Sequence, residues 1–107
     1  MFARVLEFHV KLEKKNDFIQ IHKNRILPVL RREIGFLELL PLIPFNMNED
    51  KVIIITLWAN PVDAENYDRE IFPLIVDLLK PLMSAPVTLK VYNLETSLCE
   101  QLAEALV

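Results

Sequence analysis

Apolar and polar residues alternate along residues 2–12, which are rich in Val, Leu and Phe. One face of this segment collects apolar side chains around a single charge, namely Phe2, Arg4, Leu6, Phe8, Val10 and Leu12. The other face is mixed. A period of two residues predicts a β-strand with one face in the core, because successive side chains of a strand point to opposite sides of the sheet.

Residues 16–34 follow a helical period instead. At about 100° per residue, an arc of about 120° holds Phe18, Ile19, His22, Ile26, Val29 and Leu30. Asn16 fits the N-cap of this helix, and Asp17 suits its first turn. Gly35 fits the left-handed position that ends a helix, whereas Pro28 is expected to bend the helix or to remove one hydrogen bond.

Two more strands are expected over residues 36–40 and 51–58, with a proline-rich connection between them. The second of these strands carries four β-branched residues in a row, Val52 to Ile55. Such a run favours an extended chain that is covered on both faces.

Asn60 followed by Pro61 is typical of a helix start and opens a short polar helix. An apolar helix is expected over residues 70–83 and a fourth strand over residues 87–94. Ser97 and Glu100 have the spacing of a capping box, which predicts a tail helix.

The predicted order is βαββαβ followed by a tail, which is the order of a ferredoxin-like α+β sandwich. We expect one domain over residues 1–94 and a C-terminal tail helix over residues 95–107. The strand over 51–58 is apolar on both sides, with Ile53 and Ile55 facing away from the helices. Because monomers avoid large exposed apolar patches, we expect a homodimer that pairs sheet to sheet.

Composition narrows the possible functions. The chain has 107 residues, is 52% hydrophobic and contains one glycine, Gly35. A phosphate-binding loop or a dinucleotide fingerprint needs several glycines, so neither is present. One cysteine and two histidines also exclude a disulfide framework and a cysteine-rich zinc site.

The charge is unevenly distributed, with eight lysines and arginines against four acidic residues in residues 1–35. Those on the helix, namely Lys23, Arg25, Arg31 and Arg32, are scattered around the arc outside its apolar face, and no platform of aromatic and basic side chains is present. We therefore expect no nucleic-acid partner. The apolar runs are too short to span a membrane, and the charged N-terminus does not resemble a signal peptide. We expect a cytoplasmic protein without a membrane partner.

The segments GFLELL, KVIIITLWANPVDAENY, IFPLIVDLLKPL and VTLKVYNL, in this order and spacing, resemble the antibiotic biosynthesis monooxygenase (ABM-like) family. The resemblance covers residues 2–94. It implies a dimeric α+β barrel with a pocket between the sheet and the helices of each protomer. Members of the family include cofactor-independent oxygenases of aromatic polyketides, quinol monooxygenases and haem-degrading monooxygenases.

The haem-degrading members use a helix tryptophan, a histidine and an asparagine. The corresponding positions here fall at Tyr67, at or beside Val76, and at about Leu6. The haem triad is therefore missing, so we expect no haem; a flavin is not indicated either. The resemblance implies a cofactor-independent monooxygenase that acts on a small aromatic or quinol-like substrate.

His22 is the strongest catalytic candidate, because it lies in the apolar arc of the first helix and a histidine titrates near neutral pH. The alternative is a core histidine that is satisfied by a backbone carbonyl or by Glu33. Tyr67 and Asn66 are candidates for polar contacts that hold a phenolate. The expected substrate-pocket residues are Leu6, Phe8, Ile26, Trp58 and Phe72.

The remaining polar candidates can be explained by structural roles. Glu7 and His9 share the face away from the helices, and two ligands do not make a metal site. Arg4 points to the helix side and could meet a substrate anion or an acidic residue. Cys99 lacks a basic neighbourhood that would activate it. The alternative function is a non-catalytic dimeric barrel that binds a small hydrophobic ligand or a partner protein.

Overall fold

The computed structural model describes residues 1–100 of the chain. The elements follow in this order: β1 (Phe2–His9), η1 (Leu12–Lys14), α1 (Lys15–Ile21), η2 (His22–Ile26), α2 (Leu27–Leu30), β2 (Phe36–Leu42), β3 (Lys51–Trp58), α3 (Pro61–Glu70), α4 (Phe72–Leu79), η3 (Lys80–Leu82), β4 (Thr88–Asn93) and η4 (Thr96–Leu98). The η2 segment is a π-helical stretch, and the other η segments are 3₁₀ turns.

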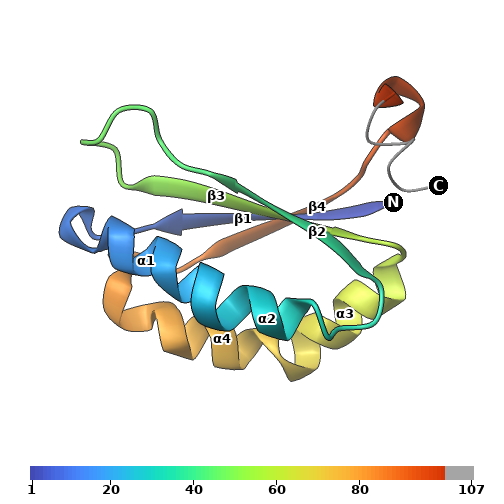
Figure 1. Ribbon diagram of the computed structural model, residues 1–107, viewed down its shortest axis with the longest axis horizontal. Coiled ribbons are helices and arrows are strands. Elements are labelled where there is room, and N and C mark those ends of the chain that lie inside the picture. The colour runs from blue at the N-terminus through green and yellow to red at the C-terminus, as the bar shows by residue number, and fades with distance from the viewer. Residues whose placement is uncertain (101–107) are drawn as a thin grey trace.

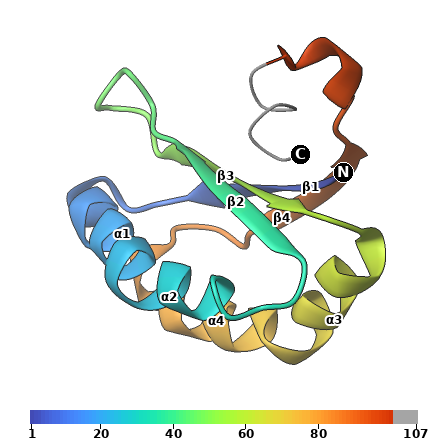
Figure 2. The ribbon, with the colours of Figure 1, turned by 45° about the vertical axis from the view of Figure 1, so that its right-hand side comes forward.

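The four strands form one antiparallel sheet in the order β2-β3-β1-β4. All of the α-helices cover one face of this sheet (Figures 1 and 2). The predicted ferredoxin-like α+β architecture is thereby confirmed. Arg4 lies opposite Thr56 and Phe8 opposite Val52 in the register of the central strands, so all of them face the helices.

Strand β3 has the bounds that its β-branched run predicts. Its side chains on the helix side, including Val52, Ile54 and Trp58, are buried. Strand β1 is shorter than expected. It ends at His9 rather than at residue 12, because Lys11 N–H pairs with the Leu82 carbonyl and the chain turns away.

Strand β2 is longer than expected and continues through Pro41 to Leu42. A proline removes one donor from the ladder, which is tolerated at the edge of a sheet. Strand β2 is such an edge strand, because it pairs with β3 alone. A bulge between Phe36 and Glu38 then sets which residues of the strand face the helices.

Helix α1 begins at Lys15, two residues before the first helical position that Asn16 as N-cap predicts. Asn16 is not its N-cap: η1 precedes α1, and Lys14 N–H is already satisfied by the Lys11 carbonyl. The π-helical stretch comes directly before Pro28. There Leu27 N–H reaches back five residues to the His22 carbonyl, so the perturbation expected from Pro28 takes the form of a wider turn.

Gly35 has the left-handed φ of +83° that its position predicts, but it does not cap the helix directly. Helix α2 ends at Leu30, and Gly35 instead turns the chain into β2, where its carbonyl accepts from Ala59 N–H. An added Cβ would come within 2.3 Å of the Asp63 carboxylate. Glycine is therefore required both by the backbone conformation and by the close packing of α3.

Helix α3 begins at the predicted cap, where the Asn60 side chain accepts from Asp63 N–H. After β4, the 3₁₀ turn η4 lies on the side of the sheet away from the helices (Figures 1 and 2). Glu95, rather than Ser97, is its N-cap, and the Ser97 hydroxyl donates to Glu95. The rest of the predicted tail helix lies outside the described residues, and the domain boundary after residue 94 stays a prediction.

Among residues 1–100, no helix is long and apolar enough to cross a membrane.

Candidate functional site

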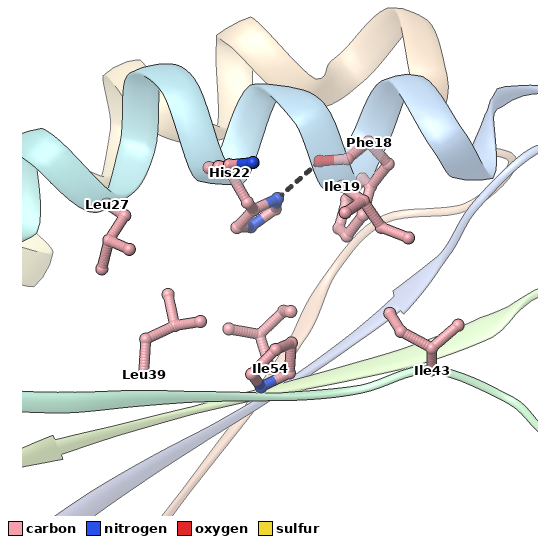
Figure 3. Close-up of a pocket in the computed structure, with 9 residues that line it drawn as sticks. Phe18, Ile19, His22, Leu27, Leu39, Ile43 and Ile54 are labelled. Atoms are coloured by element: carbon pink, nitrogen blue, oxygen red, sulfur yellow. Dashed lines mark hydrogen bonds between the residues drawn. The ribbon is translucent and has the colours of Figure 1, made fainter.

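An apolar groove lies between the first helical region and the edge strand β2 (Figure 3). Its volume is about 190 Å³. An apolar cavity of about 150 Å³ is enough to bind benzene, so the groove has room for one aromatic ring. The groove is lined by Phe18, Ile19, His22, Lys23, Leu27, Leu39, Pro41, Ile43 and Ile54.

Two periodicities build this lining. Side chains three and four residues apart lie on the same face of a helix, so Phe18, His22 and the residues beside them form one wall. Every second residue of β2 and of the chain after it, at positions 39, 41 and 43, forms the opposite wall. The groove is thus the seam between a helical face and a strand face.

Among the lining residues that the structure describes, His22 alone is both polar and buried, with 8% of its surface exposed. Its Nδ1 lies 2.9 Å from the Phe18 carbonyl oxygen. A carbonyl oxygen only accepts hydrogen bonds, so Nδ1 donates and carries the proton of the neutral ring. The other ring nitrogen, Nε2, is then a free acceptor.

The position of Nε2 follows from the hydrogen bonds of the region. It forms no hydrogen bond within the part of the chain that the structure describes. In that part, every fully buried side-chain nitrogen or oxygen has a hydrogen-bond partner, so Nε2 is not fully buried. Nε2 must therefore reach space that a ligand or water can enter. Figure 3 shows the ring extending from the helix toward Leu39 and Ile54 of the sheet.

Burial lowers the pKa of His22 from its usual value of 6.5, against a smaller opposite effect of the hydrogen bond to Phe18. The ring is therefore neutral at neutral pH. Aromatic side chains hold it in place: its centroid lies 4.4 Å from that of Phe18 and 6.1 Å from that of Phe8. A neutral, oriented imidazole with a free Nε2 can act as a general base.

A second, inner cavity lies deeper between the sheet and the helices. Its volume is about 10 Å³, which is room for a single water molecule. It is lined by Arg4, Leu6, Phe8, His22, Ile26, Leu30, Leu39, Ile54, Thr56, Tyr67, Phe72 and Ile75. His22, Leu39 and Ile54 also line the groove, so these three side chains separate the two spaces.

Arg4 provides the charge of the inner cavity. Its side chain is fully buried and forms a two-point ion pair with Asp68, in which Nε donates over 3.1 Å. A further donor of the guanidinium reaches the Thr56 hydroxyl at 3.3 Å, and that hydroxyl also accepts from Trp58 Nε1. Every buried polar group of this network is thus paired, as a buried charge requires.

Tyr67 covers the same guanidinium with its ring, whose centroid lies 5.2 Å from the Arg4 Cζ atom. Phe72 lies on it as well, at 4.8 Å. Burial is the main cause that raises the pKa of Tyr67 to about 12. Its hydroxyl therefore keeps its proton at neutral pH and can serve as a hydrogen-bond donor, not as a base.

The structure brings most of the predicted site residues together. Six of the eight line the inner cavity: Leu6, Phe8, His22, Ile26, Tyr67 and Phe72. Trp58 is completely buried and lines neither space; its ring packs on Phe36 and Tyr67. Asn66 is exposed and accepts from Arg69 on the outer side of α3, away from the other candidates.

Sequence reasoning missed the strand side of the groove. The alternation of Leu39, Pro41 and Ile43 was available as an indication, but Pro41 argued for a loop and the bulge hid the register. It also left Arg4 open between a substrate and an acidic partner. The partner is Asp68, which lies 64 positions further along the chain.

A separate cluster of charges lies at the far end of the uncovered sheet face. His9 contacts Glu7 at 3.6 Å and Asp50 at 3.3 Å, and Lys51 pairs with Glu7 at 3.2 Å. Within residues 1–100, no group of three or more His, Cys, Asp or Glu side chains is arranged to hold a metal ion. Cys99 is partly buried in the C-terminal segment, remote in sequence from both cavities.

Solved structures that carry the name antibiotic biosynthesis monooxygenase share this fold. A protein of Nitrosomonas europaea that provisionally carries this name shares 17% identity at a TM-score of 0.74, over 89% of this chain and 99% of its own. A monooxygenase of Streptomyces coelicolor, solved in complex with the ligand nanaomycin D, shares 14% identity at a TM-score of 0.75, over 88% and 87%.

A conserved protein from Methanosarcina mazei Go1 has the same fold, at 21% identity and a TM-score of 0.70 over 87% of this chain and 92% of its own. No protein-family model and no curated protein matches the sequence. Because the sequence identities are this low, the comparisons establish the fold alone. The chemistry therefore has to be argued from the site itself.

Proposed function

We propose that this protein is a cofactor-independent monooxygenase that acts on a small phenol or quinol bound in the groove. For a simple hydroquinone, the reaction takes up one O₂ and yields a hydroxyquinone and one water. The substrate supplies all of the electrons, so no metal, haem or flavin is needed. The observation that carries the proposal is the buried, neutral His22 with its open Nε2 at an apolar groove.

In this mechanism His22 Nε2 accepts the proton of the substrate hydroxyl. The resulting phenolate is electron-rich and can reduce O₂, which the neutral phenol does poorly. The apolar walls of the groove keep water away from the oxyanion and the oxygen species. The Phe18 carbonyl stabilises the imidazolium that forms, because it already accepts from Nδ1.

Tyr67 is the proposed donor to the developing oxyanion or to the incipient carbonyl on the inner side. Its raised pKa suits this role, because the hydroxyl stays protonated while the substrate ionises. A substrate that reaches Tyr67 has to displace Leu39 or share the inner cavity, since these side chains separate it from the groove. Asn66 points elsewhere and has no part in this mechanism.

Oxygen uptake with a panel of hydroquinones and polyphenols tests the proposal. We expect turnover by the wild type and a loss of about 100-fold or more in kcat for His22→Ala, because general-base catalysis contributes on that order. Tyr67→Phe should reduce kcat less. His9→Ala is the matched control, since His9 lies on the opposite sheet face. Absence of turnover with every substrate would refute the catalytic proposal.

The second candidate is a non-catalytic barrel that binds a small hydrophobic ligand or a partner protein. It is favoured by the groove itself, in which His22 and Lys23 are the only polar side chains contributed by residues 1–100. Native mass spectrometry of the protein purified from cells separates the two cases. A retained ligand together with no oxygen uptake would support binding alone.

We also propose that the protein forms a homodimer through the sheet face away from the helices. That face carries the half-buried Val5, Ile53 and Ile55, and the exposed Leu40 and Leu42 extend it along β2. Light scattering at micromolar concentration should give twice the mass of the chain. Ile55→Lys, at the centre of this face, should give a monomer; the exposed Val62→Lys on α3 should not.

A further inference from the structure

Among residues 1–100, the groove has one buried side chain that can form a hydrogen bond with a ligand, which is His22. Lys23 is exposed at the rim, and the other lining side chains besides His22 are apolar. His22 Nδ1 is already bonded to the Phe18 carbonyl, so Nε2 is the ring nitrogen without a partner among the described residues, and Figure 3 shows the ring directed across the groove toward Leu39 and Ile54.

The Phe18 carbonyl fixes this polarity. If the proton moved from Nδ1 to Nε2, the lone pair of Nδ1 would face the carbonyl oxygen across 2.9 Å, and two acceptors would be left without a donor between them. The flanking rings of Phe8 and Phe18 limit rotation of the imidazole. The ring therefore cannot exchange its acceptor for a donor to suit a different ligand.

We propose that His22 is the specificity-determining residue of the groove, and that it selects aromatic ligands with a free hydroxyl over those that offer only an ether or carbonyl oxygen in the same place. The inference rests on the groove being the ligand site of the proposed function, but it does not depend on turnover.

The physical reason is the cost of an unmatched acceptor. A phenolic hydroxyl donates to Nε2 and replaces the water that Nε2 loses when the groove fills. A methyl ether or a ketone brings a second acceptor and no proton, so Nε2 is desolvated without a partner. Sites that pair a ligand hydroxyl reject analogues without it strongly for this reason.

The same selection separates the two redox forms of a quinol. The reduced form carries the hydroxyl that Nε2 requires, whereas the quinone product carries a carbonyl. The groove should therefore hold the substrate and release the oxidised product, so that product does not accumulate in the site.

Three single-ring probes test the selection without redox chemistry: 4-ethylphenol, 4-ethylanisole and 4-ethylacetophenone. Titrations of the isotope-labelled full chain, followed by NMR of the groove methyl groups, give the dissociation constants. We expect 4-ethylphenol to bind about tenfold more tightly than the other two, although the ether is the more apolar molecule. The ¹⁵N resonance of His22 Nε2 should shift with the phenol only.

His22→Phe should abolish the preference while the groove still takes up all three probes, whereas His9→Phe should retain it. The Nε2 resonance of the wild type gives the same answer should the His22 variant fail to fold. Equal affinity of the three probes for the wild type would overturn the inference and leave the groove as a ligand site. No perturbation of the groove methyl groups by any probe would overturn both.

Discussion

The groove and the inner cavity share a wall but differ in almost every physical property. The groove is lined mostly by apolar side chains and is about 190 Å³ in volume, whereas the inner cavity is lined in part by the charged Arg4 and is about 10 Å³. Only His22, Leu39 and Ile54 separate them. The difference shows that the buried polar side chains stabilise the fold, whereas the apolar groove has room for a ligand.

The cause of the difference is the Arg4–Asp68 pair. A buried guanidinium has to satisfy its donors, so it draws in Asp68 and Thr56 and is covered by aromatic rings, which fills the space. No such requirement acts at the groove, because Phe18 satisfies the proton of His22 from within its own helix. The groove therefore needs no charged partner to be drawn into it, and it can stay open.

The largest expected effect comes from breaking the inner network. Arg4→Met should lower the free energy of unfolding by about 3 kcal/mol or more, because it leaves the partly buried Asp68 carboxylate without its partner. Urea unfolding measures the loss. The affinity of the groove for 4-ethylphenol should change little in the folded fraction; a parallel collapse of affinity would mean that the two spaces act as one site.

Removing part of the wall that the two spaces share should cost less stability and should let larger ligands bind. Leu39→Ala is expected to cost about 2 kcal/mol, since the side chain is half-buried and touches both spaces. The merged space should admit a two-ring phenol such as 2-naphthol, measured by NMR titration against the wild type. Unchanged discrimination between one and two rings would show that another side chain limits the groove.

Filling the groove should affect binding more than stability. Leu27→Trp places a large side chain in the open space, so ligand affinity should fall at least about tenfold, or about 1.4 kcal/mol. Leu74→Trp is the matched control, because Leu74 is 65% exposed on α4. A groove variant that still binds like the control would place the ligand elsewhere.

The smallest effect is a pH dependence of stability. Burial holds the pKa of His22 below the 6.5 of an exposed histidine, so the unfolded chain takes up its proton first as the pH falls. The contribution of His22 to the free energy of unfolding is fully present above about pH 6.5. It is lost progressively below that value until the pH has passed the pKa of His22 in the folded state. Unfolding curves over this pH range should show that the free energy of unfolding falls as the pH falls, both for the wild type and for His9→Gln.

His22→Gln should lack that part of the slope, because no imidazole remains to titrate at this position. Equal slopes for His22→Gln and His9→Gln would argue that His22 is not desolvated in the folded protein. Ligand affinity should follow the same direction, since a protonated Nε2 no longer accepts from a phenol.

Much of the fold was predictable from local patterns. The strand over 51–58 is marked by its β-branched run, the start of α3 by Asn60 and Pro61, and the orientation of Arg4 by strand parity. The end of β2 was not predictable, because whether Pro41 breaks a strand depends on which side of that strand is paired. The start of α1 was missed because a 3₁₀ turn leads the chain directly into the helix at Lys15, so that Asn16 lies inside the helix and not at its cap.

The candidate site divides in the same way. His22 could be found from the helical arc, because the spacing of its apolar neighbours places it on the sheet side. Its protonation, however, depends on the Phe18 carbonyl and on burial, neither of which a sequence pattern measures. The groove needs the register of β2 as well, and one bulged residue changes which side chains line it.

The sequence by itself thus determined the order of elements, the covered sheet face and the presence of a histidine and an arginine inside it. Only the tertiary structure decided that Asp68 neutralises the arginine, that the space around it is filled, and that the open space lies at the edge strand. The physical reason is range: periodicity and capping act over a few residues, whereas pairing of buried charge and the exclusion of volume depend on side chains that only the fold brings together.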